Sequence, residues 1–425
     1  MKPRNVFISF LGTSPYGGSR YIGEKPQVDR ATRFVQVATL ASVAEQFGKD
    51  DQVYIFTTKE SLKNWDDQPI KGDPESVDVK LKSEILELNI GCNIENVMVP
   101  DGKTQNEVWD IFSIIFEKLE VQDNLYFDIT HGFRSLPLLA LPLINYAKLL
   151  KNITVSGIFY GAYDRNKWKS SVWNLTDFSK LQDWTNNANI FLRTGNAKGL
   201  AEQIEGDAYA EIKEGLERFS EFTLVNRGMD IYSGQEIMKL SKDLEQAKES
   251  EDPAEKAVLP ILNKVKDRFK DYQEDTAING FYAVRWCINN GLIQQAATLL
   301  EEFIVTYLMD LIGNEKKTSS VTRAVILSFA KQGPAKYKLG TRAGYPLEKE
   351  KKVCDELSKI TELSSIGAVA KVISDKVRND VNHAGFRKKP GPKSYTEIRS
   401  IIIEQFNNLC DVLAIRGHQI EKLSL

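Results

Sequence analysis

The sequence predicts a doubly wound α/β domain at the amino terminus, followed by an all-α helical bundle. The first observation is length, because 425 residues exceed what one hydrophobic core usually organises. The second is that short β-rich runs alternate with longer helical patterns over the first third of the chain. The third is that this alternation stops near Leu181, after which apolar residues recur only at helical spacing.

Five buried strands are expected in the first domain, because five short runs are rich in β-branched and aromatic residues. They are residues 6–11, 53–56, 97–99, 125–129 and 155–160, and residues 171–175 could add an edge strand. Helices are expected over residues 30–47, 80–88, 107–119 and 138–150. An alternation of this kind builds a mostly parallel sheet with helices on both faces.

The predicted domain boundaries place the α/β domain at residues 1–190, a helical connector at 191–255 and the bundle at 256–425. The connector is highly charged between Lys239 and Pro253, which is typical of a solvated spacer, and whether it makes contacts of its own stays open. The helices of the last part are expected over residues 254–272, 278–289, 292–312, 321–330, 349–360, 367–381 and 395–413.

The composition is that of an ordinary folded protein, with 42% hydrophobic and 27% charged residues. It excludes a mostly disordered chain and a collagen-like repeat. The formal net charge of −2 means that any nucleic-acid surface must be a local patch. The most apolar stretch, residues 136–144, is too short to span a membrane. The four cysteines lack the spacing of a zinc site or a disulfide framework, so we expect a cytoplasmic protein without a metal.

Two loops rich in glycine and hydroxyl residues follow the first and fourth predicted strands. They are Gly12–Ser19 and Thr130–Ser135. In a doubly wound sheet, ligands bind beyond the carboxyl ends of the strands, where the strand order reverses. The backbone N–H groups of these loops, with His131 and Arg134, would suit a phosphate-bearing ligand. GxGxxG is absent, and the Gly12–Gly17 spacing lacks the lysine of a P-loop, so neither a dinucleotide nor triphosphate hydrolysis is indicated.

A polar helix end followed by a basic loop is the second candidate site. The polar residues of the helix end are Arg378, Asn379, Asn382 and His383. The basic residues of the loop are Arg387, Lys388 and Lys389. On spacing alone, a solvated helix end whose histidine complements the helix dipole is the alternative interpretation. Together, the polar helix end and the basic loop indicate a site for RNA.

The segments Phe7–Thr13 and Phe127–Ser135 resemble the signatures of CARF domains, the Rossmann-like sensors of type III CRISPR systems. The second segment is the more specific of the two. The resemblance implies a homodimeric sensor in which two copies form one symmetric pocket for a cyclic oligoadenylate. The residues that it assigns to this pocket are Gly12, Thr13, Ser14, Thr130, His131, Gly132 and Arg134.

The spacing of Arg378 and His383 resembles the R-x4–6-H motif of HEPN ribonucleases. Residues 286–296 and 299–302 are also similar to helices that precede this motif in CARF–HEPN proteins. The two resemblances occur in the expected order, with the sensor before the nuclease. They imply an α/β Rossmann-like CARF domain joined to an all-α HEPN bundle, in an ancillary endoribonuclease of CRISPR antiviral defence.

The implied reaction is metal-independent cleavage of single-stranded RNA, in which the 2′-hydroxyl attacks the neighbouring phosphate and leaves a 2′,3′-cyclic phosphate. Histidine titrates near neutrality, so His383 is the expected general acid–base catalyst. Arg378 would stabilise charge in the transition state, and Asn379 and Asn382 would orient the phosphate or the imidazole. The basic loop at 387–389 would bind the RNA. DNA lacks the attacking hydroxyl and is not an expected substrate.

The CARF resemblance further implies a homodimer or higher oligomer, with no other cofactor and no membrane partner. Cyclic tetra-adenylate is the first candidate for its activator, and cyclic hexa-adenylate is the second candidate. Activation requires that the ligand binds two states of the dimer with different affinity. Two alternatives stay open. One is a non-catalytic nucleotide sensor that regulates a partner, and the other is a sensor that also degrades its cyclic ligand through His131 or Thr130.

Overall fold

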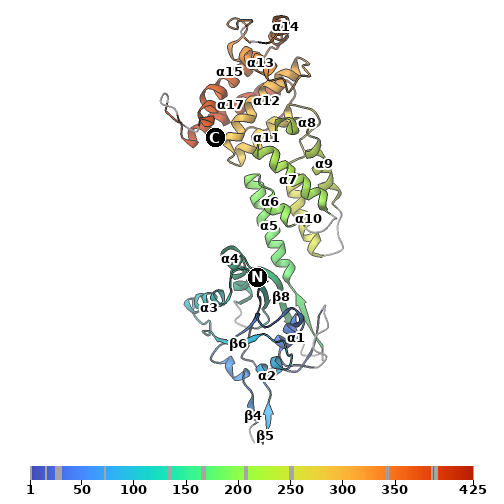
Figure 1. The fold of residues 1–425 in the computed structure, drawn as a ribbon, viewed down its shortest axis with the longest axis vertical. Helices are drawn as coiled ribbons and strands as arrows, with labels where there is room; N and C mark the ends of the chain where they lie inside the picture. The colour runs from blue at the N-terminus through green and yellow to red at the C-terminus, as the bar shows by residue number, and fades with distance from the viewer. Residues whose placement is uncertain are drawn as a thin grey trace. The chain divides into compact units, whose positions relative to one another are not determined.

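The computed structural model describes residues 2–14, 17–23, 31–70, 73–131, 136–163, 169–204, 209–247, 253–340, 342, 344–383, 386 and 391–424. The chain divides into two compact units, Met1–Leu181 (unit 1) and Gln182–Leu425 (unit 2) (Figure 1). Each unit has its own buried hydrophobic side chains, in two clusters in unit 1 and one in unit 2. The boundary lies within helix α5 (Thr176–Thr194), slightly before the predicted position at residue 190.

Unit 1 is built on a mostly parallel sheet, as the sequence predicts. Its described residues form seven strands in the order β2-β9-β8-β7-β1-β3-β6. Within this part of the chain, β8 and β9 pair antiparallel, whereas the other neighbouring strands pair in parallel. The strands are β1 (Asn5–Phe10), β2 (Arg20–Ile22), β3 (Gln52–Thr57), β6 (Asn93–Met98), β7 (Asn124–Asp128), β8 (Thr154–Ala162) and β9 (Lys169–Asn174). The helices are α1 (Val35–Ala41), η1 (Ala44–Gln46), η2 (Ser61–Asn64), α2 (Leu81–Leu86), α3 (Gln105–Lys118) and α4 (Leu136–Lys151).

The central strand β1 explains why helices cover both faces of the sheet. Successive side chains of a strand point to opposite faces, and all six residues of β1 are buried. Val6, Ile8 and Phe10 belong to a core that includes side chains of α3 and α4. Phe7 belongs to a second core that includes side chains of α1 and α2. An apolar run without polar alternation is therefore what this position in the sheet requires.

The sequence analysis does not predict β2, β4 (Gln68–Ile70) or β5 (Asp73–Asp78). The last two form a separate antiparallel ribbon, and every residue of β4 is exposed. An exposed ribbon needs no buried apolar face, so it leaves no hydrophobic pattern in the sequence. The strand β2 has only three residues, with one buried side chain between two exposed ones.

The described residues of unit 2 form helices joined by turns and loops, with no strand among them. Its elements are α6 (Lys198–Glu202), α7 (Ala210–Leu224), α8 (Gly228–Ser233), α9 (Gln235–Gln246), α10 (Pro253–Lys266), α11 (Ile278–Asn289), α12 (Ile293–Leu311), α13 (Ser320–Gln332), α14 (Leu347–Ser358), α15 (Leu363–Val372), the π-helical turn η4 (Ile373–Arg378), α16 (Asn379–Asn382) and α17 (Tyr395–Ile415). One continuous cluster of buried side chains runs from Ala188 to Ile420. The helical bundle that the sequence predicts is therefore present.

The expected connector, residues 191–255, contributes to this same core. Phe191 on α5 and Phe219 on α7 contact Phe269 and Trp286, with ring centroids 4.8–6.3 Å apart. Aromatic packing of this kind buries large apolar areas. In the structure this segment belongs to unit 2 and is not a solvated spacer.

Among the described helices, none combines the length and the apolar composition that crossing a membrane would need.

Candidate functional site

The first candidate site lies where β1 and β7 end side by side. These strands pair in parallel, with Ser9 opposite Asp128. Because β1 lies between β7 and β3, the strand order reverses here, as the sequence predicts. Ser9 Oγ donates a hydrogen bond of 2.9 Å to Asp128 Oδ2, and Thr39 Oγ1 of α1 donates to the same oxygen at 3.3 Å. The fully buried carboxyl group of Asp128 therefore ties both strand ends to a helix.

Thr130 is fixed by the residues around it. Its backbone N–H and its hydroxyl both donate to Asp128 Oδ1, at 3.0 and 2.5 Å. The same hydroxyl accepts a hydrogen bond of 2.7 Å from the backbone N–H of Gly161 on β8. A hydroxyl has one proton to donate, and here that proton is directed at Asp128. Thr130 therefore shapes the loop after β7, and only an acceptor lone pair of its hydroxyl stays available to a ligand.

The loop after β1 supplies three further predicted pocket residues. Gly12 and Thr13 are partly buried, and Ser14 is exposed. The side-chain amide of Asn64 donates a hydrogen bond of 3.0 Å to the Gly12 carbonyl, which holds the start of this loop. Two other predicted residues, Gly132 and Arg134, lie outside the described residues.

His131 and Asp128 have pKa values that are shifted in opposite directions. Burial lowers the pKa of His131, and the neighbouring Asp128 carboxylate partly opposes this change. Burial raises the pKa of Asp128, although hydrogen bonds from Thr130 and Ser9 favour its ionised form. At neutral pH the His131 imidazole is therefore uncharged. It can recognise a ligand by donating and accepting hydrogen bonds, and not as a cation.

Replacing Asp128 by Asn is expected to lower the free energy of unfolding of unit 1 by about 2–4 kcal/mol, because the amide N–H₂ would face buried donors. The matched control is Asp66→Asn, since Asp66 is an exposed aspartate of the same unit that pairs with Lys82. Calorimetric unfolding of both variants is the measurement. A change in Asp128→Asn no larger than that in Asp66→Asn would contradict a structural role for this carboxyl group.

The second candidate site is built around Arg378, the last residue of η4. Its Nη1 donates to the carboxylate of Glu301, which is 3% exposed, and its Nη2 lies 3.2 Å from Glu302 Oε1. The hydroxyl of Ser374 donates to the second oxygen of Glu301. Arg323 also donates to Glu302, through Nη2 at 2.8 Å and Nε at 3.2 Å. Two adjacent carboxylates on α12 therefore hold the guanidinium of Arg378 in a defined orientation.

His383 follows α16 directly and its side chain is exposed, as are those of Asn379 and Asn382. Within the described residues no hydrogen bond joins His383 to Arg378. The Nε atom of Arg378 is buried and has no partner in the same part of the chain. Burial lowers the pKa of Arg378, but a guanidinium remains charged at neutral pH. The structure thus presents an exposed histidine five residues after a fixed, positively charged arginine, whose Nε donor is buried without a partner among the described residues.

Asp380 ties this helix end to the start of α17. Its side chain is 2% exposed, and its Oδ2 accepts a hydrogen bond of 3.0 Å from the backbone N–H of Lys393. The contact joins α16 to the residue just before the N-cap of α17. The three predicted RNA-binding residues of that loop, Arg387, Lys388 and Lys389, lie outside the described residues.

The sequence analysis does not single out Asp128, Glu301, Ser374 or Asp380 as site residues. The signal for Glu301 is visible in the sequence, because it is a charged residue within the apolar helical pattern of residues 292–312. A buried charge in such a helix needs a partner, but spacing alone does not identify Arg378 as that partner. Among the described residues, no three His, Cys, Asp or Glu side chains gather as a group that could hold a metal ion.

Comparison with known proteins finds two family models that match successive parts of the chain. Residues 6–164 match the family model described as the CARF domain of the CRISPR system endoribonuclease Csx1. Residues 180–275 match the model for the second domain of the CRISPR-associated protein MJ1674. CRISPR-associated protein MJ1674 of Methanocaldococcus jannaschii is 26% identical over 215 residues, which is 49% of this chain. The matched part spans only 33% of the length of that relative.

Proposed function

The chain is a CARF-containing CRISPR-associated protein, and on this premise we propose that it is an endoribonuclease activated by a cyclic oligoadenylate. The observation that carries the proposal is the pairing of an amino-terminal CARF domain with a helix end that fixes Arg378 and exposes His383. The arrangement fits cleavage of single-stranded RNA by a HEPN-type ribonuclease that needs no metal ion.

The sensor step takes place in unit 1. A cyclic oligoadenylate, with cyclic tetra-adenylate the first candidate and cyclic hexa-adenylate the second, binds at the loops after β1 and β7. Two copies of the chain complete one pocket. The neutral imidazole of His131 and the backbone of the Gly12–Ser14 loop supply hydrogen bonds to the ligand. Binding activates the nuclease only because the ligand prefers the active state of the dimer over the inactive one.

The chemical step takes place at the end of α16. The 2′-hydroxyl of the RNA loses its proton as its oxygen bonds to the neighbouring phosphorus, and the bond to the 5′-oxygen of the next nucleotide breaks. His383 serves as the acid–base group for these proton transfers, because an imidazole can both accept and donate a proton and this side chain is exposed at the surface. Arg378, held by Glu301 and Glu302, stabilises the charge on the phosphorane-like transition state. Asn379 and Asn382 orient the phosphate.

An RNA in which the 2′-hydroxyl at the cleavage position is replaced by hydrogen is expected to resist cutting, because it lacks the attacking group. The measurement compares this RNA with the unmodified one, at equal concentration and in the presence of cyclic tetra-adenylate. Mass spectrometry of the unmodified products is expected to show a 2′,3′-cyclic phosphate and a 5′-hydroxyl. Equal cleavage of both RNAs, or a 5′-phosphate on the product, would overturn this mechanism.

A further inference from the structure

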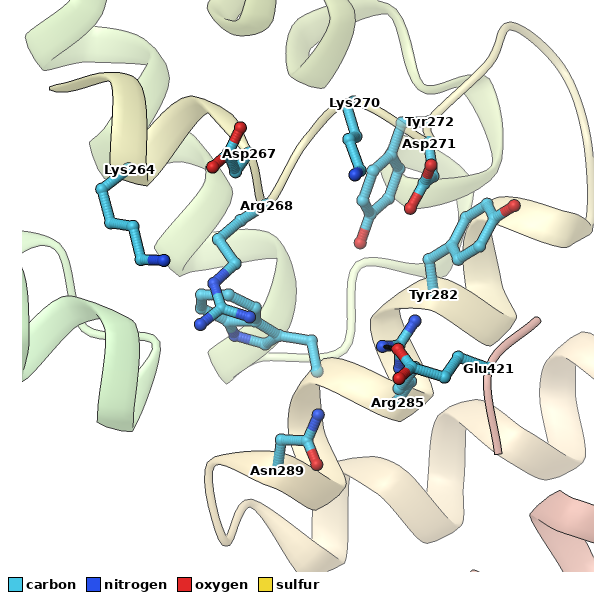
Figure 2. A pocket seen from close by; sticks show the side chains of 11 residues that line it. Lys264, Asp267, Arg268, Lys270, Asp271, Tyr272, Tyr282, Arg285, Asn289 and Glu421 are labelled. Atoms are coloured by element: carbon cyan, nitrogen blue, oxygen red, sulfur yellow. Dashed lines mark hydrogen bonds and ion pairs between the residues drawn. The ribbon is translucent and has the colours of Figure 1, made fainter. Parts of the chain in front are cut away.

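Unit 2 contains a pocket of about 370 Å³ that none of the functions above uses. Figure 2 shows it between the end of α10, the segment that follows α10, and α11, with Glu421 of the carboxyl-terminal segment at one side. A volume of this size lies in the range of small-ligand sites. Its lining residues are Lys264, Asp267, Arg268, Lys270, Asp271, Tyr272, Tyr282, Arg285, Trp286, Asn289 and Glu421.

Five charged residues of the lining form no ion pair with any other residue that the structure describes. Lys264, Arg268 and Lys270 form no ion pair with any described residue, and neither do Asp267 and Asp271. Arg285 does pair with Glu421, but its Nε is buried without a hydrogen-bond partner in the described part of the chain. A ligand that satisfies this pocket must therefore offer an anionic group to the cations and hydroxyl or amino donors to the carboxylates.

Aromatic and amide groups complete the lining. The guanidinium of Arg268 lies 5.8 Å from the ring centroid of the buried Trp286, which holds it as a flat cationic surface. Tyr272 is 7% exposed, its hydroxyl makes no hydrogen bond to a described residue, and Figure 2 shows it beside Lys270 at the pocket. Burial raises the pKa of Tyr272, so this hydroxyl remains a donor. Asn289 adds an amide that both donates and accepts.

We propose that this pocket binds a nucleoside phosphate. Its phosphate would lie against Lys264, Arg268 and Lys270, because none of these three cations forms an ion pair with a described residue. A base can stack on the guanidinium plane of Arg268, and Asn289 can hydrogen-bond the base edge. The carboxylates of Asp267 and Asp271 can accept hydrogen bonds from ribose hydroxyls. The nucleoside phosphate is either a free mononucleotide or one unit of an RNA chain.

The test is binding of probes to the full chain, measured by calorimetry on the unmodified protein and on variants of the pocket. Binding elsewhere on the chain is recognised because the pocket variants leave it unchanged. The probes are the four nucleoside 5′-monophosphates and a 2′-O-methyl RNA decamer, which the proposed nuclease cannot cut. The decamer is also expected to bind at the end of α16, so binding of either probe supports the pocket only where the pocket variants weaken it. The probe whose binding they weaken identifies the source of the nucleoside phosphate. Failure of every probe to bind overturns the proposal, whether or not the protein cleaves RNA.

Two variants locate the binding. Arg268→Gln is expected to weaken it about tenfold or more, because it removes a charge-assisted hydrogen bond and the stacking surface. Lys270→Gln removes a pocket charge without touching Trp286 and is expected to weaken it as well, which separates loss of binding from loss of fold. The matched control is Arg218→Gln, since Arg218 is an exposed arginine of α7 that pairs with Glu214 and Glu236. Unchanged binding in both pocket variants would contradict the proposal.

Discussion

Replacing His383 by Ala is expected to reduce ligand-activated RNA cleavage by about 10²- to 10⁴-fold, which is the contribution of a positioned general acid–base group. The side chain is exposed at the end of α16, so its loss should leave the fold of unit 2 intact. The measurement is the initial rate of cleavage of a labelled RNA, with the thermal unfolding of each variant recorded beside it.

The matched control for His383 is His418, a second histidine of unit 2 that lies after α17 with its ring 6.4 Å from that of Tyr307. The variant His418→Ala is expected to cleave RNA at the rate of the unmodified protein. If His383→Ala retained that rate as well, the catalytic role of the helix end would be wrong. The alternative of a non-catalytic nucleotide sensor that regulates a partner would then be favoured.

Replacing Glu301 by Gln is expected to lower the free energy of unfolding of unit 2 by about 2 kcal/mol, somewhat less than for a completely buried pair. The expected loss of stability is smaller than for a completely buried pair because the side chain of Arg378 is 29% exposed and keeps access to water. Cleavage is expected to slow by about tenfold or more, because a misplaced guanidinium stabilises the transition state less well. The effect should fall on kcat more than on KM, since Glu301 acts through Arg378.

The neighbouring Glu302→Gln variant is the control for this prediction. Glu302 is 40% exposed, and its replacement leaves the ion pair of Arg378 and Glu301 in place. The loss of stability and the loss of cleavage rate should therefore both be smaller than in Glu301→Gln. A higher cleavage rate in Glu301→Gln would show that the ion pair restrains Arg378, and the positioning role would be wrong.

The fold of unit 1 is predictable because its central strands β1, β3 and β7 are short apolar runs that are almost completely buried. In β1, six consecutive residues are buried, and the shortness of the apolar run and the Gly12 that follows it favour a strand over a buried helix. The reversal of strand order beside β1 is typical of a doubly wound sheet, and it is the reason why the loops at Gly12 and Thr130 are the predicted ligand site. The exposed ribbon of β4 and β5 lacks such a pattern and is not predictable in this way.

The local parts of the sites are predictable, whereas their long-range contacts are not. Arg378 and His383 stand out because they lie close together in the sequence beside polar residues. The contact of Arg378 with Glu301 joins positions 77 residues apart, and no spacing rule connects them. The π-helical turn η4, which ends at Arg378, is likewise invisible to a period-based analysis. Turns of this kind are frequent at functional sites, and here the turn ends at the predicted catalytic arginine.

The most direct test of the central claim is cleavage of a labelled single-stranded RNA in EDTA, with and without cyclic tetra-adenylate, by the unmodified protein and by His383→Ala. We expect cleavage only when the ligand is present, undiminished by EDTA and absent in the variant. A protein that stays inactive with cyclic tetra-adenylate and cyclic hexa-adenylate, or that cuts RNA equally without either, would contradict the account of a ligand-activated ribonuclease.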